Sequence, residues 1–111
     1  MSLDLSYDLD VCQHCGRHAE RVFDKNITYN LGPMWRAAGL PFSDESIEGK
    51  PARDMLEPMR DGLVALLAEP EKFRAMNPPN GWGSYDGLVR FVQAAIAAAE
   101  EYPDAIVRAS R

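Results

Sequence analysis

The chain has 111 residues, of which 46% are hydrophobic and 26% are charged, and its formal net charge is −5. These proportions are typical of one globular domain. Because the negative charge is spread along the chain, no basic stripe is available to neutralise a phosphate backbone, and binding to duplex nucleic acid is not expected. No apolar run reaches the roughly 18 residues that a membrane-spanning helix needs, so no membrane association is expected.

The first residues, 1–5, lack the basic and apolar regions of a signal peptide, which predicts a cytoplasmic protein. In a reducing compartment, the two cysteines are expected to be thiols or metal ligands rather than a structural disulfide.

The N-terminal part of the chain predicts a β-hairpin. Residues 3–11 alternate between apolar and polar side chains, the pattern of a half-buried strand. Arg21 to Phe23 begin a second strand, which Ile27 and Tyr29 continue after a break at residues 24–25. Residues 12–19 then form the long tip of the hairpin.

The middle of the chain predicts helices. Gly32 and Pro33 open a short helix that Gly39 ends, and residues 40–50 are expected to form a polar loop. A stripe of leucines and methionines between Pro51 and Pro70 indicates a long helix. Pro58 inside this stripe predicts either a kink or a junction of two helices.

At the C-terminal end, Ser84 is the N-cap of a last helix that Pro103 ends, and Ala105 to Arg108 form a short strand that can pair with the hairpin. We therefore predict one α+β domain over residues 1–111. It consists of a hairpin over 1–30 with a Cys-x-x-Cys tip, a helical part over 31–102 and a closing strand over 104–109. The small antiparallel sheet is expected to be covered by two long helices and one short helix.

Cys12 and Cys15 form a Cys-x-x-Cys motif followed by a glycine, which is typical of half of a zinc site. His18 is a candidate third ligand, and the fourth ligand has to come from His14, a carboxylate or another chain. A redox dithiol is a second interpretation. A polar hairpin tip with two free thiols is the third, and it is the interpretation that the sequence favours.

Asn26, Thr28 and Asn30 lie on one face of the chain if it is extended there. Their donors and acceptors suit the edge of a nucleobase or a sugar. The alternative is local, since Asn30 can form a turn that leads into the following helix.

The segment 77–85 is rich in Pro, Gly and aromatic residues and predicts a ligand-binding loop. Its two glycines permit close approach of the backbone, and the helix that follows attracts anions at its N-terminus. Trp82 and Tyr85 can stack on a base, with Asn80 and Trp35 as further members of the site. The alternative is that Trp82 packs into the core above a structural turn.

Three segments together resemble a family of small proteins carried mostly by bacteriophages: residues 24–34, the leucine-rich helix with its Glu57-Pro58 pair, and residues 77–85. The resemblance covers roughly residues 20–111 and is based on the Asn-x-Thr-x-Asn and Asn-Gly-Trp-Gly-x-Tyr signatures. The family has no settled biochemical function, and the Cys-x-x-Cys tip occurs in some members and not in others. The resemblance implies a protein that acts in the host cytoplasm by occupying a nucleotide signal or the surface of a defence protein.

Three hypotheses about function follow. The first is a non-catalytic binding protein that holds a nucleotide-like ligand between the 26/28/30 face and the 82–85 loop. The second is a protein–protein inhibitor or adaptor whose acidic surface, including residues 40–50, covers a basic host surface. The third is a small zinc-binding module. No catalytic residue is predicted, and the sequence leaves the oligomeric state open.

Overall fold

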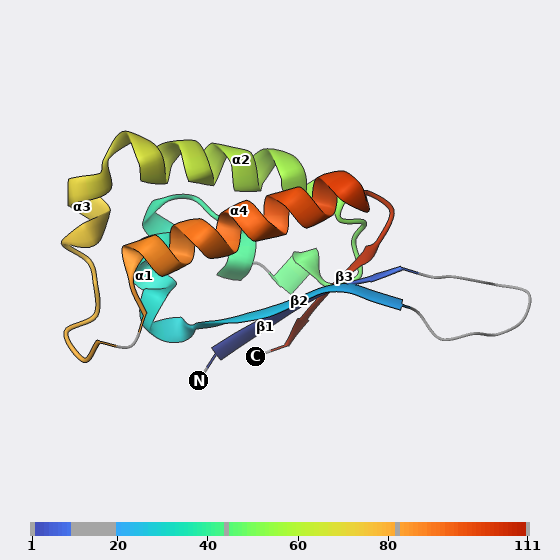
Figure 1. The fold of residues 1–111 in the computed structure, drawn as a ribbon, viewed down its shortest axis with the longest axis horizontal. Coiled ribbons are helices and arrows are strands. Elements are labelled where there is room, and N and C mark those ends of the chain that lie inside the picture. Colours follow the sequence, from blue (N-terminus) through green and yellow to red (C-terminus); the bar gives the residue numbers. More distant parts are fainter. Residues whose placement is uncertain (1, 10–19, 44, 82, 111) are drawn as a thin grey trace, which may run out of the picture.

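The structure is a computed structural model, and it describes residues 2–9, 20–43, 45–81 and 83–110. Its sheet has three antiparallel strands in the order β2-β1-β3, with helices on one face (Figure 1). The strands are β1 (Ser2–Leu9), β2 (Glu20–Thr28) and β3 (Ile106–Ser110). The predicted α+β class, with a hairpin and a C-terminal strand in one sheet, is confirmed.

The α-helices of the described chain are α1 (Gly32–Ala37), α2 (Arg53–Ala68), α3 (Pro70–Arg74) and α4 (Tyr85–Glu101). Single turns of 3₁₀-helix lie at η1 (Tyr29–Leu31), η2 (Pro41–Ser43) and η3 (Glu45–Ile47). The stretch predicted as a polar loop thus contains two helical turns, because Phe42 and Ile47 anchor it in the core. Pro58 lies inside α2, which is one helix.

The two faces of the sheet follow from the alternation along β1. Leu3, Leu5 and Tyr7 are fully buried beneath the helices. The residues between them lie on the opposite, open face, where Asp4 is opposite Asn26 of β2 and Ser110 of β3. Strand β2 is continuous through the break predicted at residues 24–25, although the register shifts between Tyr7 and Asp8 of β1.

Helix α4 is next to both α2 and the sheet (Figure 1). It begins at Ser84, whose Oγ accepts a hydrogen bond of 3.1 Å from the Gly87 N–H, as the sequence predicted. The hydroxyl of Tyr7 on β1 donates to the Ala95 carbonyl of α4 at 3.0 Å, and Met59 of α2 packs on the same hydroxyl. Tyr7 therefore joins the sheet to both long helices.

The outer edge of β3 is covered by the segment that precedes α2. The Val107 N–H donates to the Lys50 carbonyl, the Gly49 N–H donates to the Val107 carbonyl, and both distances are 2.8 Å. The Glu48 carboxylate accepts a hydrogen bond from the Ala109 N–H and one from Arg108. The chain thus occupies the hydrogen-bonding positions that a further strand would need on this side of the sheet.

Candidate functional site

Trp35 and Tyr85, two of the predicted ligand-binding residues, are buried. Trp35 has no exposed surface, and its Nε1 donates to the Ser43 Oγ at 2.7 Å. Tyr85 is 3% exposed, and its hydroxyl donates to the Leu66 carbonyl at 2.7 Å. The expectation is corrected for both residues, because a ring enclosed by the core offers no face to a ligand.

The Asn-x-Thr-x-Asn motif is not one extended row. The strand ends at Thr28, and the chain turns into the 3₁₀-helix that contains Asn30. The Thr28 Oγ1 accepts a hydrogen bond of 3.2 Å from the Asn30 N–H. The expectation of a shared polar face over Asn26, Thr28 and Asn30 is corrected, since the threonine caps a turn.

The two signature motifs nevertheless meet in the fold. Gly83 has a φ of +94°, and a Cβ at this position would lie 2.6 Å from the Thr28 Cγ2 and 2.9 Å from the Leu31 Cγ. Beside it, the Asn77 Oδ1 accepts a hydrogen bond of 2.8 Å from the Tyr85 N–H. Among the described residues, the contact between the motifs is therefore close packing of Gly83 on Thr28 and Leu31.

Several predicted site residues lie outside the described residues, namely Trp82 and the metal candidates Cys12, His14, Cys15 and His18. The zinc site and the stacking role of Trp82 remain predictions. Asn80 is exposed on its loop. Within the described ranges, no group of three or more His, Cys, Asp or Glu side chains is placed to hold a metal ion. None of the described helices combines the length and the apolar character needed to cross a membrane.

A groove of about 440 Å³ lies between β2 and α4 and is the candidate site. Strand β2 contributes Lys25 and Asn26, both exposed. Helix α4 contributes Arg90, also exposed, and the buried ring of Phe91. The groove therefore combines two cationic groups and an amide at its rim with an apolar floor.

The two cations of this groove lack an ion pair, unlike most of the basic side chains in the described part of the chain. Neither Lys25 nor Arg90 forms an ion pair within the described part of the chain, and the same holds for Arg36 and Lys50, which do not line the groove. The ion-paired basic residues are Arg21, Arg53, Arg60, Lys72, Arg74 and Arg108. Two uncompensated positive charges in one groove attract anions.

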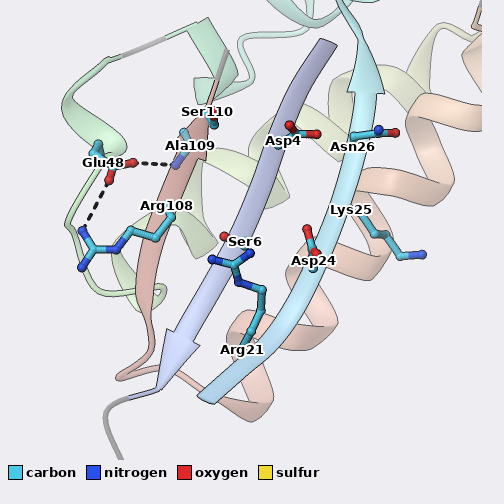
Figure 2. Close-up of a pocket in the computed structure, with 10 residues that line it drawn as sticks. All are labelled: Asp4, Ser6, Arg21, Asp24, Lys25, Asn26, Glu48, Arg108, Ala109 and Ser110. Carbon is cyan, nitrogen blue, oxygen red and sulfur yellow. Dashed lines mark hydrogen bonds and ion pairs between the residues drawn. The ribbon is translucent and has the colours of Figure 1, made fainter. Parts of the chain in front are cut away.

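A second depression, of about 590 Å³, lies on the open face of the sheet and is lined by all three strands (Figure 2). Arg21 donates to Asp8 at 3.0 Å, and this hydrogen bond raises the pKa of the Arg21 guanidinium. The open face is thus a mosaic of both charges, on which Asp4 and Asp24 form no direct ion pair among the described residues.

The sequence predicted Asn26 as a site residue, and Asn26 lines the groove, but Lys25 and Arg90 were not predicted. Lys25 lies on the same face of the strand as the apolar residues Phe23 and Ile27. A lysine at a position where the alternation calls for an apolar residue could have indicated a functional side chain. Arg90 lies between buried positions of a regular amphipathic helix and carries no such signal. The groove arises from the docking of two elements that are distant in sequence.

No protein-family model, curated protein or solved structure matches this chain. The resemblance to a bacteriophage family therefore remains a prediction from the two signatures, and the site is interpreted from its own geometry.

Proposed function

We propose that this chain is a non-catalytic binding protein that takes an anionic ligand in the groove between β2 and α4. The observation that supports the proposal is that Lys25 and Arg90 lie at the rim of one groove and form no ion pair among the described residues. The protein has a net charge of −5, so a local positive groove is a specific feature and does not reflect a generally basic surface.

A nucleotide-like small molecule meets these requirements. Its phosphates would contact Lys25 and Arg90, the Asn26 amide would bond to a base or sugar edge, and Phe91 would contact an apolar ring. In the cytoplasm of a host cell, which the bacteriophage signatures suggest, the ligand would be a nucleotide signal or an acidic part of a defence protein.

Titration calorimetry with nucleoside triphosphates and inorganic triphosphate tests this proposal. We expect Lys25→Ala and Arg90→Ala each to weaken binding by about tenfold, equivalent to about 1.4 kcal/mol. Lys50→Ala is the matched control, because Lys50 is an exposed, unpaired cation outside the groove. An equal loss in the control, or no binding of any of these anions, would refute the groove as an anion site.

A protein adaptor that uses acidic surface is the second candidate. The carboxylates of Asp4 and Asp24 on the open face of the sheet form no direct ion pair among the described residues, and this favours a basic partner. Binding of a lysine-rich peptide should weaken steeply with salt and should fall in Asp4→Asn and Asp24→Asn. Asp54→Asn, an exposed change on α2, should leave it unaltered.

The zinc-binding module remains a separate prediction, because its ligands lie outside the described residues. Metal analysis of the purified chain tests it: one zinc ion for each chain, lost in Cys12→Ser, would support the module. A metal-free chain would leave the tip of the hairpin with two free thiols.

A further inference from the structure

The two outer edges of the sheet differ in their backbone hydrogen bonding. The outer edge of β3 is bonded to Lys50, Gly49 and Glu48. No hydrogen bond from the described residues reaches the outer edge of β2, which is nine residues long. An uncovered edge of this length exposes backbone donors and acceptors that another strand can use.

The hydrogen-bond pattern identifies these exposed groups. Val107 directs its N–H and C=O away from β1, so its partner Tyr7 directs its own groups toward β2. Phe23, opposite Tyr7, and Lys25, two residues along, therefore bond inward to β1. The intervening residues Asp24 and Asn26 direct their backbone N–H and C=O outward.

Depressions flank this edge on both sides of the sheet. Lys25 and Asn26 line the groove next to α4 and also the depression on the open face. Successive side chains of a strand point to opposite faces of its sheet. A strand added beside β2 would therefore direct alternate side chains to the two faces of the sheet on which these depressions lie.

The helix side of the edge has room for such a strand. Gly87 and Ala94 line the groove on α4 and bring little side-chain bulk to it. Arg90 lies between them in sequence and is exposed at the rim. Side chains on this side of an added strand would meet Arg90 and Lys25, so acidic residues would be favoured there.

We propose that the outer edge of β2 binds an extended segment of a partner protein as a fourth strand, with acidic side chains toward Lys25 and Arg90. This rests on the proposed function, since it uses the same groove and names the anionic ligand as a polypeptide. Backbone bonds to Asp24 and Asn26 supply affinity, and the two cations select the sequence.

A second copy of the chain fits the edge less well. Symmetric antiparallel pairing centred on residue 24 sets Asp24 against Asp24, and pairing centred on residue 25 sets Lys25 against Lys25. Like charges directly opposite each other destabilise a strand pair. The same lysine that disfavours self-pairing favours an acidic segment.

Selection from a displayed library of random nine-residue peptides on the full chain tests the proposal. We expect the selected peptides to carry acidic residues at every second position. Asn26→Pro should weaken them at least tenfold, because proline removes an outward N–H and is tolerated at a sheet edge. Asn26→Ala removes the side-chain amide and keeps the N–H, so Asn26→Pro should bind the peptides at least tenfold more weakly than Asn26→Ala does.

Methylation of the peptide backbone gives the same test without changing the protein. Methyl groups on one set of alternate peptide nitrogens should abolish binding, and methyl groups on the other set should leave it intact. Any one of three results would overturn strand addition. No peptide is selected, peptides methylated in either set still bind, or the Asn26→Pro variant binds the peptides as tightly as wild type does. A dimer of the chain that Asn26→Pro dissociates would assign the edge to a second copy and would also overturn it.

The same variants separate this inference from the proposed function. If Lys25→Ala and Arg90→Ala lose triphosphate binding, but no selected peptide is weakened by Asn26→Pro, the groove is an anion site. That result would refute strand addition. If Asn26→Pro weakens peptide binding but Lys25→Ala and Arg90→Ala do not, the strand edge binds peptides without the two cations. That result would refute the groove as an anion site.

Discussion

Tyr7 and Tyr29 both bring a hydroxyl group into the interior, but their surroundings differ. The Tyr7 hydroxyl donates to the Ala95 carbonyl at 3.0 Å. The Tyr29 hydroxyl is buried, and the described residues offer it no hydrogen-bond partner. Its ring lies 5.5 Å from the ring of Trp35, so packing holds Tyr29 in place. A buried hydroxyl without a partner costs desolvation energy that nothing offsets.

Substitution of these two tyrosines should therefore have opposite consequences. Tyr7→Phe should lower the free energy of unfolding by about 1 kcal/mol, because it removes a hydrogen bond. Tyr29→Phe should leave it unchanged or raise it, because it removes an unsatisfied polar group. Urea denaturation of both variants measures the difference, and a larger loss in Tyr29→Phe would contradict this account.

Gly83 and Gly81 form a second informative pair. Both have a positive φ, +94° and +76°, so alanine is strained at either position by about 1–2 kcal/mol. A Cβ at Gly81 meets nothing within 4 Å, whereas a Cβ at Gly83 overlaps Thr28 and Leu31. Gly83→Ala should therefore lower the melting temperature more than Gly81→Ala does. Equal effects would show that backbone strain alone explains both glycines.

At the scale of single elements, the cover over β3 depends on one carboxylate. Glu48 accepts hydrogen bonds from the Ala109 N–H and from Arg108 (Figure 2). Glu48→Ala should speed hydrogen exchange at the Ala109 amide at least tenfold, because that N–H loses its acceptor. Glu45→Ala, an exposed change in the adjacent turn, is the control. An unchanged exchange rate in Glu48→Ala would show that the carboxylate does not close this edge.

The elements could be predicted from sequence wherever a local pattern was unambiguous. The alternation in β1, the proline that opens α1 and the Ser84 cap each correspond to an observed feature. The turns η2 and η3 were missed, because their helical form depends on burying Phe42 and Ile47 in a core that local sequence does not reveal. Pro58 left two interpretations open, and in the structure it lies inside the single helix α2.

The candidate site was less predictable than the elements. The aromatic residues Trp35 and Tyr85 were predicted to belong to a ligand-binding site, but the core encloses both. Whether a ring is buried depends on which elements pack over it, and the sequence of the ring's own segment does not carry that information. Lys25 and Arg90 come together for the same reason, through the docking of α4 beside β2.

At the scale of the whole molecule, Tyr7 makes stability sensitive to alkaline pH. Burial raises the pKa of this phenol above its ordinary value of 10.0. In the unfolded chain Tyr7 loses its proton near pH 10, whereas in the folded chain it keeps the proton to higher pH. Its contribution is therefore complete below pH 10 and is lost as the pH rises above that value.

Denaturation between pH 9 and pH 11 tests this dependence. Wild type should lose stability with a steeper slope than Tyr7→Phe over about this range. The neighbouring Glu101 carboxylate raises the pKa of half-buried Tyr102 in the same direction, and this contribution is common to both proteins. Parallel slopes in the two proteins would contradict a role for Tyr7.

The order of the strands has a consequence for folding. Strand β1 is central in the sheet, and its neighbour β3 follows it in the sequence only after the helices of the described chain. Pairing of β1 with β3 must therefore close a long loop, which slows folding. Until β3 docks, one edge of β1 and the apolar side chains of Leu5 and Tyr7 are open to other molecules, so the yield of refolding should fall as the protein concentration rises.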